Sequence, residues 1–413
     1  MAASSALLKV NSGYGIKKIN QEHLVSGPRV DRKHSIFSCI PHGEQTQRRF
    51  RSYSWTRTTK GCHNKAFTTT MLSSIQENYA VTGNLHADDV TPEDETKTRD
   101  DDVSRATLIW RAAKLPMYTV ALIPVTVGTA AAYWQTGLYS SARYFKILAS
   151  YVLVIVWLNL SNDVYDFDTG VDVNKKESVI NLFGSRTGIN IIAWLILVLG
   201  FLGLAWVAVE ARNPRSMILL ASAVFCSFLY QCPPFRLSYY GVGEPLLFVA
   251  FGPLSTIAFY LLHSIKSELP ITSTIVWSSI LVGLTTSLIL FCSHFHQIKD
   301  DKAVGKMSPL VRLGTETGSR VVKFAVVGLY SIILVLGFTQ NLPLASVILC
   351  AMTLPMGNLV VSFVEKNHMD KTKIFMGKYL CVRLHTVFGA ALAAGLVVAR
   401  KFAVQQLPQA IVL

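Results

Sequence analysis

From residue 115 onwards, long uncharged runs alternate with short polar segments. A helix that spans a membrane needs about 20 apolar residues, and most of these runs approach or exceed that length. The run 324–364 is long enough for two helices, and Asn341-Leu342-Pro343 marks the turn between them. The pattern predicts helices at 115–134, 146–163, 187–208, 216–233, 245–264, 274–293, 321–339, 344–364 and 380–399.

The composition indicates a chain that lies in a lipid bilayer. Hydrophobic residues make up 51% of the 413 residues and charged residues only 15%, whereas a soluble domain has about 25% charged residues. The net charge of +14 does not indicate a nucleic-acid partner, because the rest of the surface is mostly lipid-facing and residues 1–67 alone contain twelve Lys/Arg against three acids. We therefore expect an all-α, polytopic membrane bundle of about nine transmembrane helices, and no nucleic-acid binding.

The chain divides into three segments. Residues 1–67 are basic and rich in Ser, Thr and Arg, a composition typical of an organelle-targeting sequence, and the Met-Ala-Ala-Ser-Ser start favours a chloroplast transit peptide. A disordered basic arm of the mature protein is the alternative. Residues 68–104 predict a disordered acidic linker, and residues 105–413 form the membrane domain.

Basic residues are distributed unequally between the two ends of the predicted helices. The face that carries the start of the first helix has eighteen Lys/Arg in its segments, and the opposite face has seven. Positive charge marks the side of a membrane protein that is not translocated. In a plastid this first face would be the stromal side.

A polar cluster occupies the end of the second predicted helix. Asn159, Asn162, Asp163 and Asp166 are spaced i, i+3, i+4 and i+7, so they share one helical face. Acids at the end of a membrane helix usually face a bundle interior or an aqueous cavity. Because clustered carboxylates without basic neighbours need a cation, and oxygen ligands suit Mg²⁺, the cluster predicts a magnesium site.

A second polar cluster follows the sixth predicted helix. His294, Gln297 and Asp301 are spaced i, i+3 and i+7, which predicts one helical face, whereas His294 and His296 point to different faces and are a poor transition-metal pair. Four predicted helices separate the two clusters, so both should open on the same side. Two acidic sites across one opening can hold a diphosphate through Mg²⁺.

These motifs resemble those of the UbiA-type membrane prenyltransferases, and within them the 1,4-dihydroxy-2-naphthoate prenyltransferase branch. The resemblance covers about residues 105–400. The matching positions are Asn162, Asp163, Asp166, Gly170 and Asp172; Asp301 to Lys306 with Leu310 to Gly314; and Tyr230, Pro233-Pro234 and Gly241 to Glu244.

The resemblance implies a helix bundle with a central cavity for a prenyl diphosphate. The implied magnesium ligands are Asp163, Asp166 and Asp301. Lys302, Lys306 or Arg236 would take up charge as diphosphate leaves, although Lys302 and Lys306 could equally be positive-inside anchors. The further substrate-binding residues implied are Asn159, Asn162, Asp172, Tyr230, His294, Gln297, Asp300 and Lys306.

The second motif departs from the usual family pattern, which has Asn and Asp where His294 and Gln297 stand. This variant is similar to plant and cyanobacterial enzymes that attach a phytyl chain, and it leaves Asp300 and Asp301 as the acids of the second site. The implied reaction joins phytyl diphosphate to a carboxylated naphthoquinol, 1,4-dihydroxy-2-naphthoate, or its quinone, with loss of CO₂. This is a step of phylloquinone synthesis in a chloroplast membrane, either inner envelope or thylakoid.

Several alternatives remain at this stage. Within the same class, the acceptor could be homogentisate, chlorophyllide or, in mitochondria, hydroxybenzoate. From other classes, the chain could be a cation-coupled transporter or a non-catalytic membrane scaffold. The acids at helix ends rather than at mid-membrane disfavour the transporter, and a scaffold leaves the acidic faces unexplained.

Overall fold

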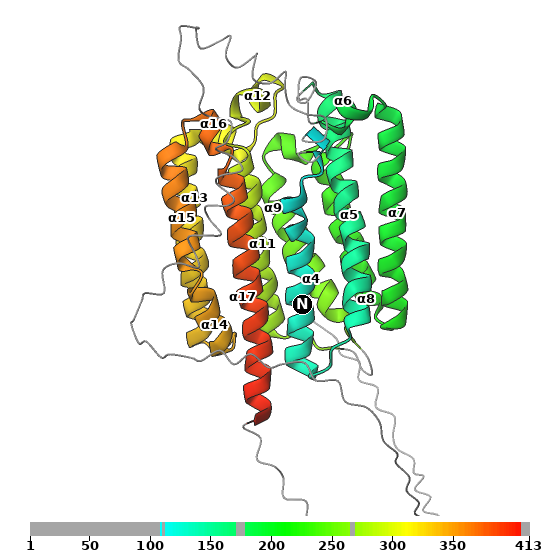
Figure 1. The fold of residues 1–413 in the computed structure, drawn as a ribbon, viewed down its shortest axis with the longest axis vertical. Coiled ribbons are helices and arrows are strands. Elements are labelled where there is room, and N and C mark those ends of the chain that lie inside the picture. Colours follow the sequence, from blue (N-terminus) through cyan, green and yellow to red (C-terminus); the bar gives the residue numbers. More distant parts are fainter. Residues whose placement is uncertain (1–107, 110–111, 171–177, 265–268, 406–413) are drawn as a thin grey trace, which may run out of the picture. The chain divides into compact units, whose positions relative to one another are not determined.

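The structure, a computed structural model, describes residues 108–109, 112–170, 178–264 and 269–405, all within the compact unit Asp89–Leu413. Every regular element in these ranges is helical, and the long helices run side by side (Figure 1). The predicted all-α membrane fold is therefore confirmed. The predicted targeting segment, the acidic linker and Asp172 lie outside the described residues.

The first half of the bundle is built around α4 and α5. Its elements are η1 (Leu115–Tyr118), α4 (Thr119–Thr136), α5 (Ser141–Asp168), α6 (Val179–Phe183), α7 (Arg186–Glu210) and α8 (Pro214–Gln231). The helices α5 and α7 approach closely at Gly200, where an added Cβ would lie 2.7 Å from the Ser150 carbonyl oxygen. Small residues at such crossings allow close packing of helices in a membrane.

The second half continues from a short 3₁₀ turn, η2 (Leu237–Tyr240), to the last helix. Its elements are α9 (Gly243–Val249), the π-helical η3 (Ala250–Thr256), α10 (Ile257–Leu261), α11 (Ser273–Ser293), α12 (Ile298–Ala303), α13 (Pro309–Phe338), α14 (Leu344–Ala351), α15 (Leu354–Asn367), α16 (Lys371–Ile374) and α17 (Gly377–Gln405). The segment α9–η3–α10 is continuous and corresponds to one predicted span.

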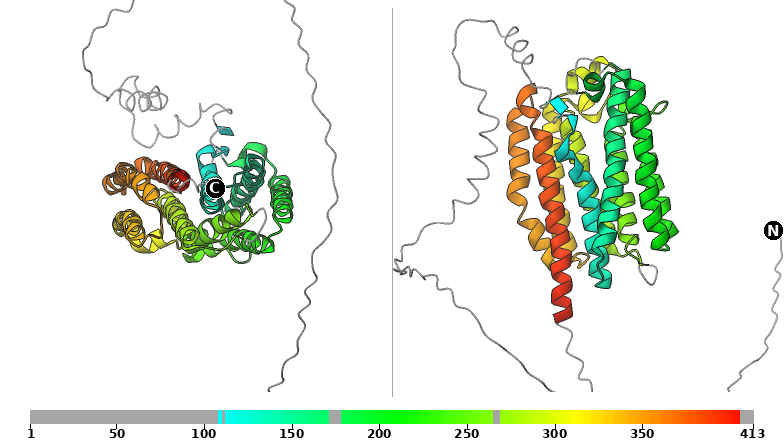
Figure 2. Two further views of the ribbon diagram at one scale, coloured as in Figure 1. Left: turned by 90° about the horizontal axis from the view of Figure 1, so that it is seen from below. Right: turned by 45° about the vertical axis from the view of Figure 1, so that its right-hand side comes forward.

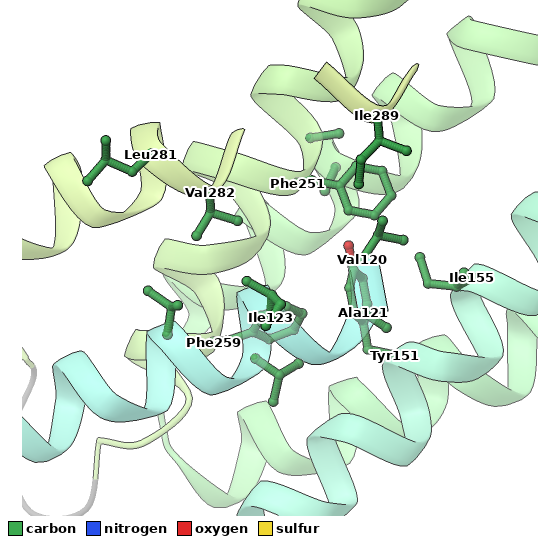
Figure 3. Packing of buried hydrophobic residues seen from close by; sticks show 14 of the residues in the cluster. Val120, Ala121, Ile123, Tyr151, Ile155, Phe251, Phe259, Leu281, Val282 and Ile289 are labelled. Atoms are coloured by element: carbon green, nitrogen blue, oxygen red, sulfur yellow. The ribbon is translucent and has the colours of Figure 1, made fainter. Parts of the chain in front are cut away.

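Among the described residues, eight helices are long and apolar enough to cross a membrane. The predicted number was about nine, and the difference is α8, whose 18 residues include Arg215 and Gln231 near its ends. The core between the spans is apolar, with Ile123 of α4, Tyr151 of α5 and Phe259 of α10 packed together (Figure 3).

Three predicted boundaries differ from the structure. The helix α5 continues to Asp168, so all four polar residues of its cluster lie inside the helix. The expected single helical face for His294, Gln297 and Asp301 is wrong, because α11 ends at Ser293 and α12 begins only at Ile298. The helix α13 begins at Pro309 and kinks at Gly314, where φ is 78°, well before the predicted start at 321.

The connections that carry the polar clusters lie at one end of the bundle. The short helices α6, α12 and α16 are all at this end, uppermost in Figure 1, and the view from another side shows the same arrangement (Figure 2). The four helices predicted between the two polar clusters placed both clusters at the same end of the bundle. This end is called the polar end below.

Candidate active site

The acidic face of α5 is held by neighbouring donors. Asn162 Nδ2 donates to Asp166 Oδ2 at 2.7 Å, one helical turn away. Lys114 Nζ lies 2.6 Å from Asp163 Oδ1, and the Asp163 side chain is only 3% exposed. Lys114 precedes the first span and has a left-handed backbone (φ 50°). The expectation that these carboxylates lack a basic neighbour is therefore wrong for Asp163.

The second cluster is centred on Asp301, which is fully buried. Lys306 Nζ lies 3.2 Å from Asp301 Oδ1, and the Lys306 backbone N–H donates to the Asp301 carbonyl at 2.8 Å. Neither carboxylate oxygen of Asp301 accepts a well-aligned hydrogen bond from the described residues. Asp301 therefore keeps acceptor capacity for a further ligand.

Lys306 is a permanent cation. Burial lowers the pKa of its ammonium group, but the Tyr230 hydroxyl and the carboxylates of Asp301 and Asp166 raise it by more, so that the pKa lies above the usual value for lysine. An acid from each of the two clusters thus acts on one ammonium group.

Tyr239, in η2, links the two clusters. Its hydroxyl donates to Thr169 Oγ1 at the end of α5 at 2.8 Å, and its carbonyl accepts from Met307 N–H at 2.8 Å. Lys306 Nζ lies 5.9 Å from the centroid of the same ring. Tyr230, near the end of α8, packs against the start of α9, where a Cβ added to Gly243 would lie 2.9 Å from its ring.

Sequence reasoning assigned no role to Glu244, which lies in the first turn of α9. Its Oε1 lies 3.1 Å from His294 Nδ1, and the side chains of His294 and Glu244 are 3% and 13% exposed. The second carboxylate oxygen of Glu244 is buried and has no hydrogen-bond partner among the described residues. The only sequence signal was its place in the Gly241-Val242-Gly243-Glu244 motif.

The other predicted site residues are more exposed to solvent than Asp163 and Asp301. Lys302 and Asp300 are exposed, and Asp300 Oδ2 pairs with Lys371 Nζ at 3.0 Å. Gln297 is half-buried. Arg236 is also half-buried, with a left-handed backbone (φ 42°) and a buried Nε that has no hydrogen-bond partner in the described part of the chain.

Asn159 lies one turn below Asn162 on α5. Its Nδ2 is buried and has no hydrogen-bond partner among the described residues.

The carboxylates of the two clusters could bind a metal ion whose remaining ligands come from the substrate. Within the described residues, no three His, Cys, Asp or Glu side chains form a ready-made metal cage. Magnesium commonly uses one or two carboxylates and completes its shell with water and substrate phosphates. Asp163, Asp166 and the unsaturated, buried carboxylate of Asp301 supply oxygen ligands of this kind, so the residues fit Mg²⁺.

The loop between α8 and α9 contacts the loop after α12 at Gly241. The backbone there is left-handed (φ +80°), and an added Cβ would lie 3.0 Å from the Met307 carbonyl oxygen. Met307 N–H donates to the Tyr239 carbonyl at 2.8 Å. Gly241 thus allows this loop to pack against the residue that follows Lys306.

We expect Gly241→Ala to impair both stability and turnover. The left-handed backbone costs about 1–2 kcal/mol for a residue with a Cβ, and the contact with Met307 adds a displacement next to Lys306. Gly184→Ala is the matched control, since Gly184 also has a left-handed backbone (φ +71°) but no described atom within 4 Å of the added Cβ. The thermal unfolding temperature, measured in detergent, should fall in both variants. Activity should fall only in Gly241→Ala. Equal activities would contradict the role of this packing.

This helical membrane bundle, with carboxylates from two segments and a buried lysine at one end, has the features of a membrane-embedded enzyme. Residues 121–382 match the UbiA prenyltransferase family, and the chain belongs to this family.

Two relatives are similar over most of their length. The chain is 60% identical over 305 residues to 2-carboxy-1,4-naphthoquinone phytyltransferase, chloroplastic, from Arabidopsis thaliana, covering 73% of this chain and 80% of that protein. It is 41% identical over 288 residues to 2-carboxy-1,4-naphthoquinone phytyltransferase from Synechocystis sp., covering 70% and 92%.

A solved structure shares the fold. The apo structure of a UbiA homolog from Aeropyrum pernix K1 superimposes with a TM-score of 0.54 at 13% identity, covering 66% of this chain and 97% of that chain.

Proposed function

We propose that this prenyltransferase transfers a phytyl group from phytyl diphosphate to a carboxylated naphthoquinol, 1,4-dihydroxy-2-naphthoate or its quinone 2-carboxy-1,4-naphthoquinone, with loss of CO₂. The two relatives above carry the name of this activity. The observation that carries the proposal is the buried Asp301–Lys306 pair, held next to the end of α5 through Tyr239, because a diphosphate needs a cation-rich, metal-binding site.

The donor diphosphate binds at the polar end. Asp163, Asp166 and Asp301 would hold Mg²⁺, which supplies charge neutralisation of the diphosphate when it is bound. Lys306 lies within the same group of charges and stabilises the negative charge that develops on the leaving diphosphate. Arg236, whose buried Nε has a free donor, extends this positive surface.

The prenyl chain follows the apolar interior away from this end. A small cavity inside the bundle is lined by apolar side chains of α5, α7, α8 and η3, among them Leu158, Leu204, Leu220, Val224 and Phe251, and it would have to widen to admit the chain. Leu158 is one turn below Asn162 on α5. A long apolar chain that begins at the acids therefore meets apolar surface immediately, and burial of each CH₂ is favourable by about 0.8 kcal/mol.

The proposed location is a chloroplast membrane, with the active site on the stromal side. The polar end carries most of the loop lysines and arginines, which marks the side that is not translocated. The chloroplastic relative supports the organelle. A water-soluble diphosphate group can reach this end without crossing the bilayer.

The experiment incubates the purified protein with phytyl diphosphate, Mg²⁺ and one of three acceptors: 1,4-dihydroxy-2-naphthoate, homogentisate or chlorophyllide. We expect a phytylated, decarboxylated naphthoquinol from the first acceptor only. The reaction should stop with a chelator and return when Mg²⁺ is restored, since the carboxylates alone cannot neutralise a diphosphate. Product from homogentisate or chlorophyllide instead of the naphthoate would overturn the proposed acceptor.

A further inference from the structure

The pair of Glu244 and His294 is a second polar group at the site, beside the acids that face the diphosphate. Glu244 comes from the start of α9 and His294 from the residue that ends α11. The two side chains are 50 residues apart in sequence and their polar atoms are 3.1 Å apart. Such a buried contact costs desolvation, and a bundle of apolar helices does not require it for stability.

The contact selects one tautomer of His294. A carboxylate can only accept hydrogen bonds, so the Nδ1 nitrogen that faces Glu244 must be the donor. In the neutral ring, Nε2 then carries the free lone pair and can accept a proton. A carboxylate that orients a histidine in this way is the arrangement that makes histidine an effective general base.

The pair lies next to the diphosphate site. His294 lies in the turn that leads into α12, where Gln297 N–H donates to the His294 carbonyl at 3.1 Å and Asp301 N–H donates to the Gln297 carbonyl at 2.8 Å. The α9 backbone is brought close by Gly243, where an added Cβ would lie 2.9 Å from the Tyr230 ring. Tyr230 therefore packs against the turn of α9 that carries Glu244.

We propose that His294, oriented by Glu244, is the base that accepts the hydroxyl proton of the aromatic acceptor. This inference rests on the proposed function, in which the acceptor is a naphthoquinol. An ionised hydroxyl makes the ring far more electron-rich, so a base at this position promotes attack on the allylic carbon. His294 is then a catalytic residue, and Glu244 is a positioning residue.

The step balances without a further reactant. The proton of the quinol hydroxyl moves to His294 Nε2, and the bond between the allylic carbon and the diphosphate oxygen breaks with its electron pair leaving on diphosphate. The carboxylate-bearing ring carbon forms the new C–C bond. CO₂ then departs and leaves its bonding electrons in the ring, after which the proton returns from His294 to the same oxygen.

The test compares His294→Gln and Glu244→Gln with the parent protein. Both substitutions keep the side-chain size close. Ser287→Ala is the matched control, because Ser287 Oγ donates to the Glu244 backbone carbonyl and, within the described part of the chain, does not bond its carboxylate. Loss of a general base lowers turnover by about 100-fold or more, so we expect that loss in His294→Gln. A smaller loss, roughly ten-fold or more, is expected in Glu244→Gln, and parent activity in Ser287→Ala.

Two further measurements separate a base from a structural contact. Binding of phytyl diphosphate with Mg²⁺, measured by calorimetry, should be unchanged in both Gln variants, which also shows that they are folded. The deficit in turnover of His294→Gln relative to the parent should shrink as pH rises and the quinol ionises by itself. His294 contacts Glu244, and the Asp301–Lys306 pair lies on the connection that follows His294; these charged groups are common to both proteins.

The contrary outcomes are distinct. Parent-like turnover in His294→Gln overturns the proposal, and so does a deficit that is constant with pH and accompanied by lost phytyl diphosphate binding. If the parent protein uses homogentisate in place of the naphthoate, the proposed acceptor is wrong. The same comparison is then made with that phenol, whose hydroxyl poses the same requirement, and it still decides the role of His294.

Discussion

Asp166→Asn should abolish prenyl transfer while leaving the protein folded. Asp166 accepts a hydrogen bond from Asn162 at 2.7 Å, and the amide oxygen of an asparagine can still accept that bond. What the variant loses is one negative charge at the proposed magnesium site. Loss of one electrostatic group that stabilises the transition state typically costs 10²–10³ in turnover, and we expect about 10³ or more here.

The matched control is Asp168→Asn on the same helix. Asp168 is partly exposed and pairs with Arg186 at the start of α7. An exposed ion pair contributes about 0.2–1 kcal/mol to stability. This variant should therefore unfold at a slightly lower temperature and keep its turnover. Turnover is measured with phytyl diphosphate at saturating Mg²⁺. Parent-like turnover in Asp166→Asn would remove Asp166 from the proposed metal site.

The sequence was sufficient to predict the membrane spans, because a charged side chain in the bilayer has a high free-energy cost. The uncharged run that predicted a helix at 187–208 became α7, Arg186–Glu210, with its ends at the first charged residues. The same argument failed for α13, which begins at Pro309 with charged residues in its first turns. A helix that extends out of the membrane is not limited by the uncharged run.

The break between α11 and α12 had no sequence signal. No Gly or Pro occurs between Ser293 and Ile298, and the i, i+3, i+7 spacing matched a continuous helix. Tertiary contacts determine the local structure instead. The turn places His294 against Glu244 on α9 and leaves Asp301 on a separate short helix that faces Lys306.

Long-range pairs were the part of the site that a single sequence could not reveal. Lys114 and Asp163 are 49 positions apart, and periodicity says nothing about such contacts. Spacing identified the acids of α5, because they share one face of one helix. It could not identify Glu244, a lone carboxylate whose importance depends on a partner 50 residues away.

Lys306→Met should be the most destabilising substitution at the site. It leaves the fully buried carboxylate of Asp301 without its cation, and breaking a buried ion pair by removing one partner costs about 3–5 kcal/mol. Because the folded-state pKa of Lys306 is raised, the stabilisation is present in full below the ordinary lysine pKa of about 10.4. It is lost only as pH rises through the raised value, so the effect should be constant around neutral pH.

The double variant Lys306→Met/Asp301→Leu separates stability from chemistry. Replacing both members of a buried pair by apolar side chains is often neutral or stabilising, so much of the lost thermal stability should return. Prenyl transfer should not return, because the double variant lacks both a proposed magnesium ligand and the cation facing the leaving diphosphate. Unfolding in detergent and turnover are measured on the parent, both single variants and the double. If the double variant regained activity together with stability, the pair would only hold the α12 connection in place, and the diphosphate would be bound by the α5 acids alone.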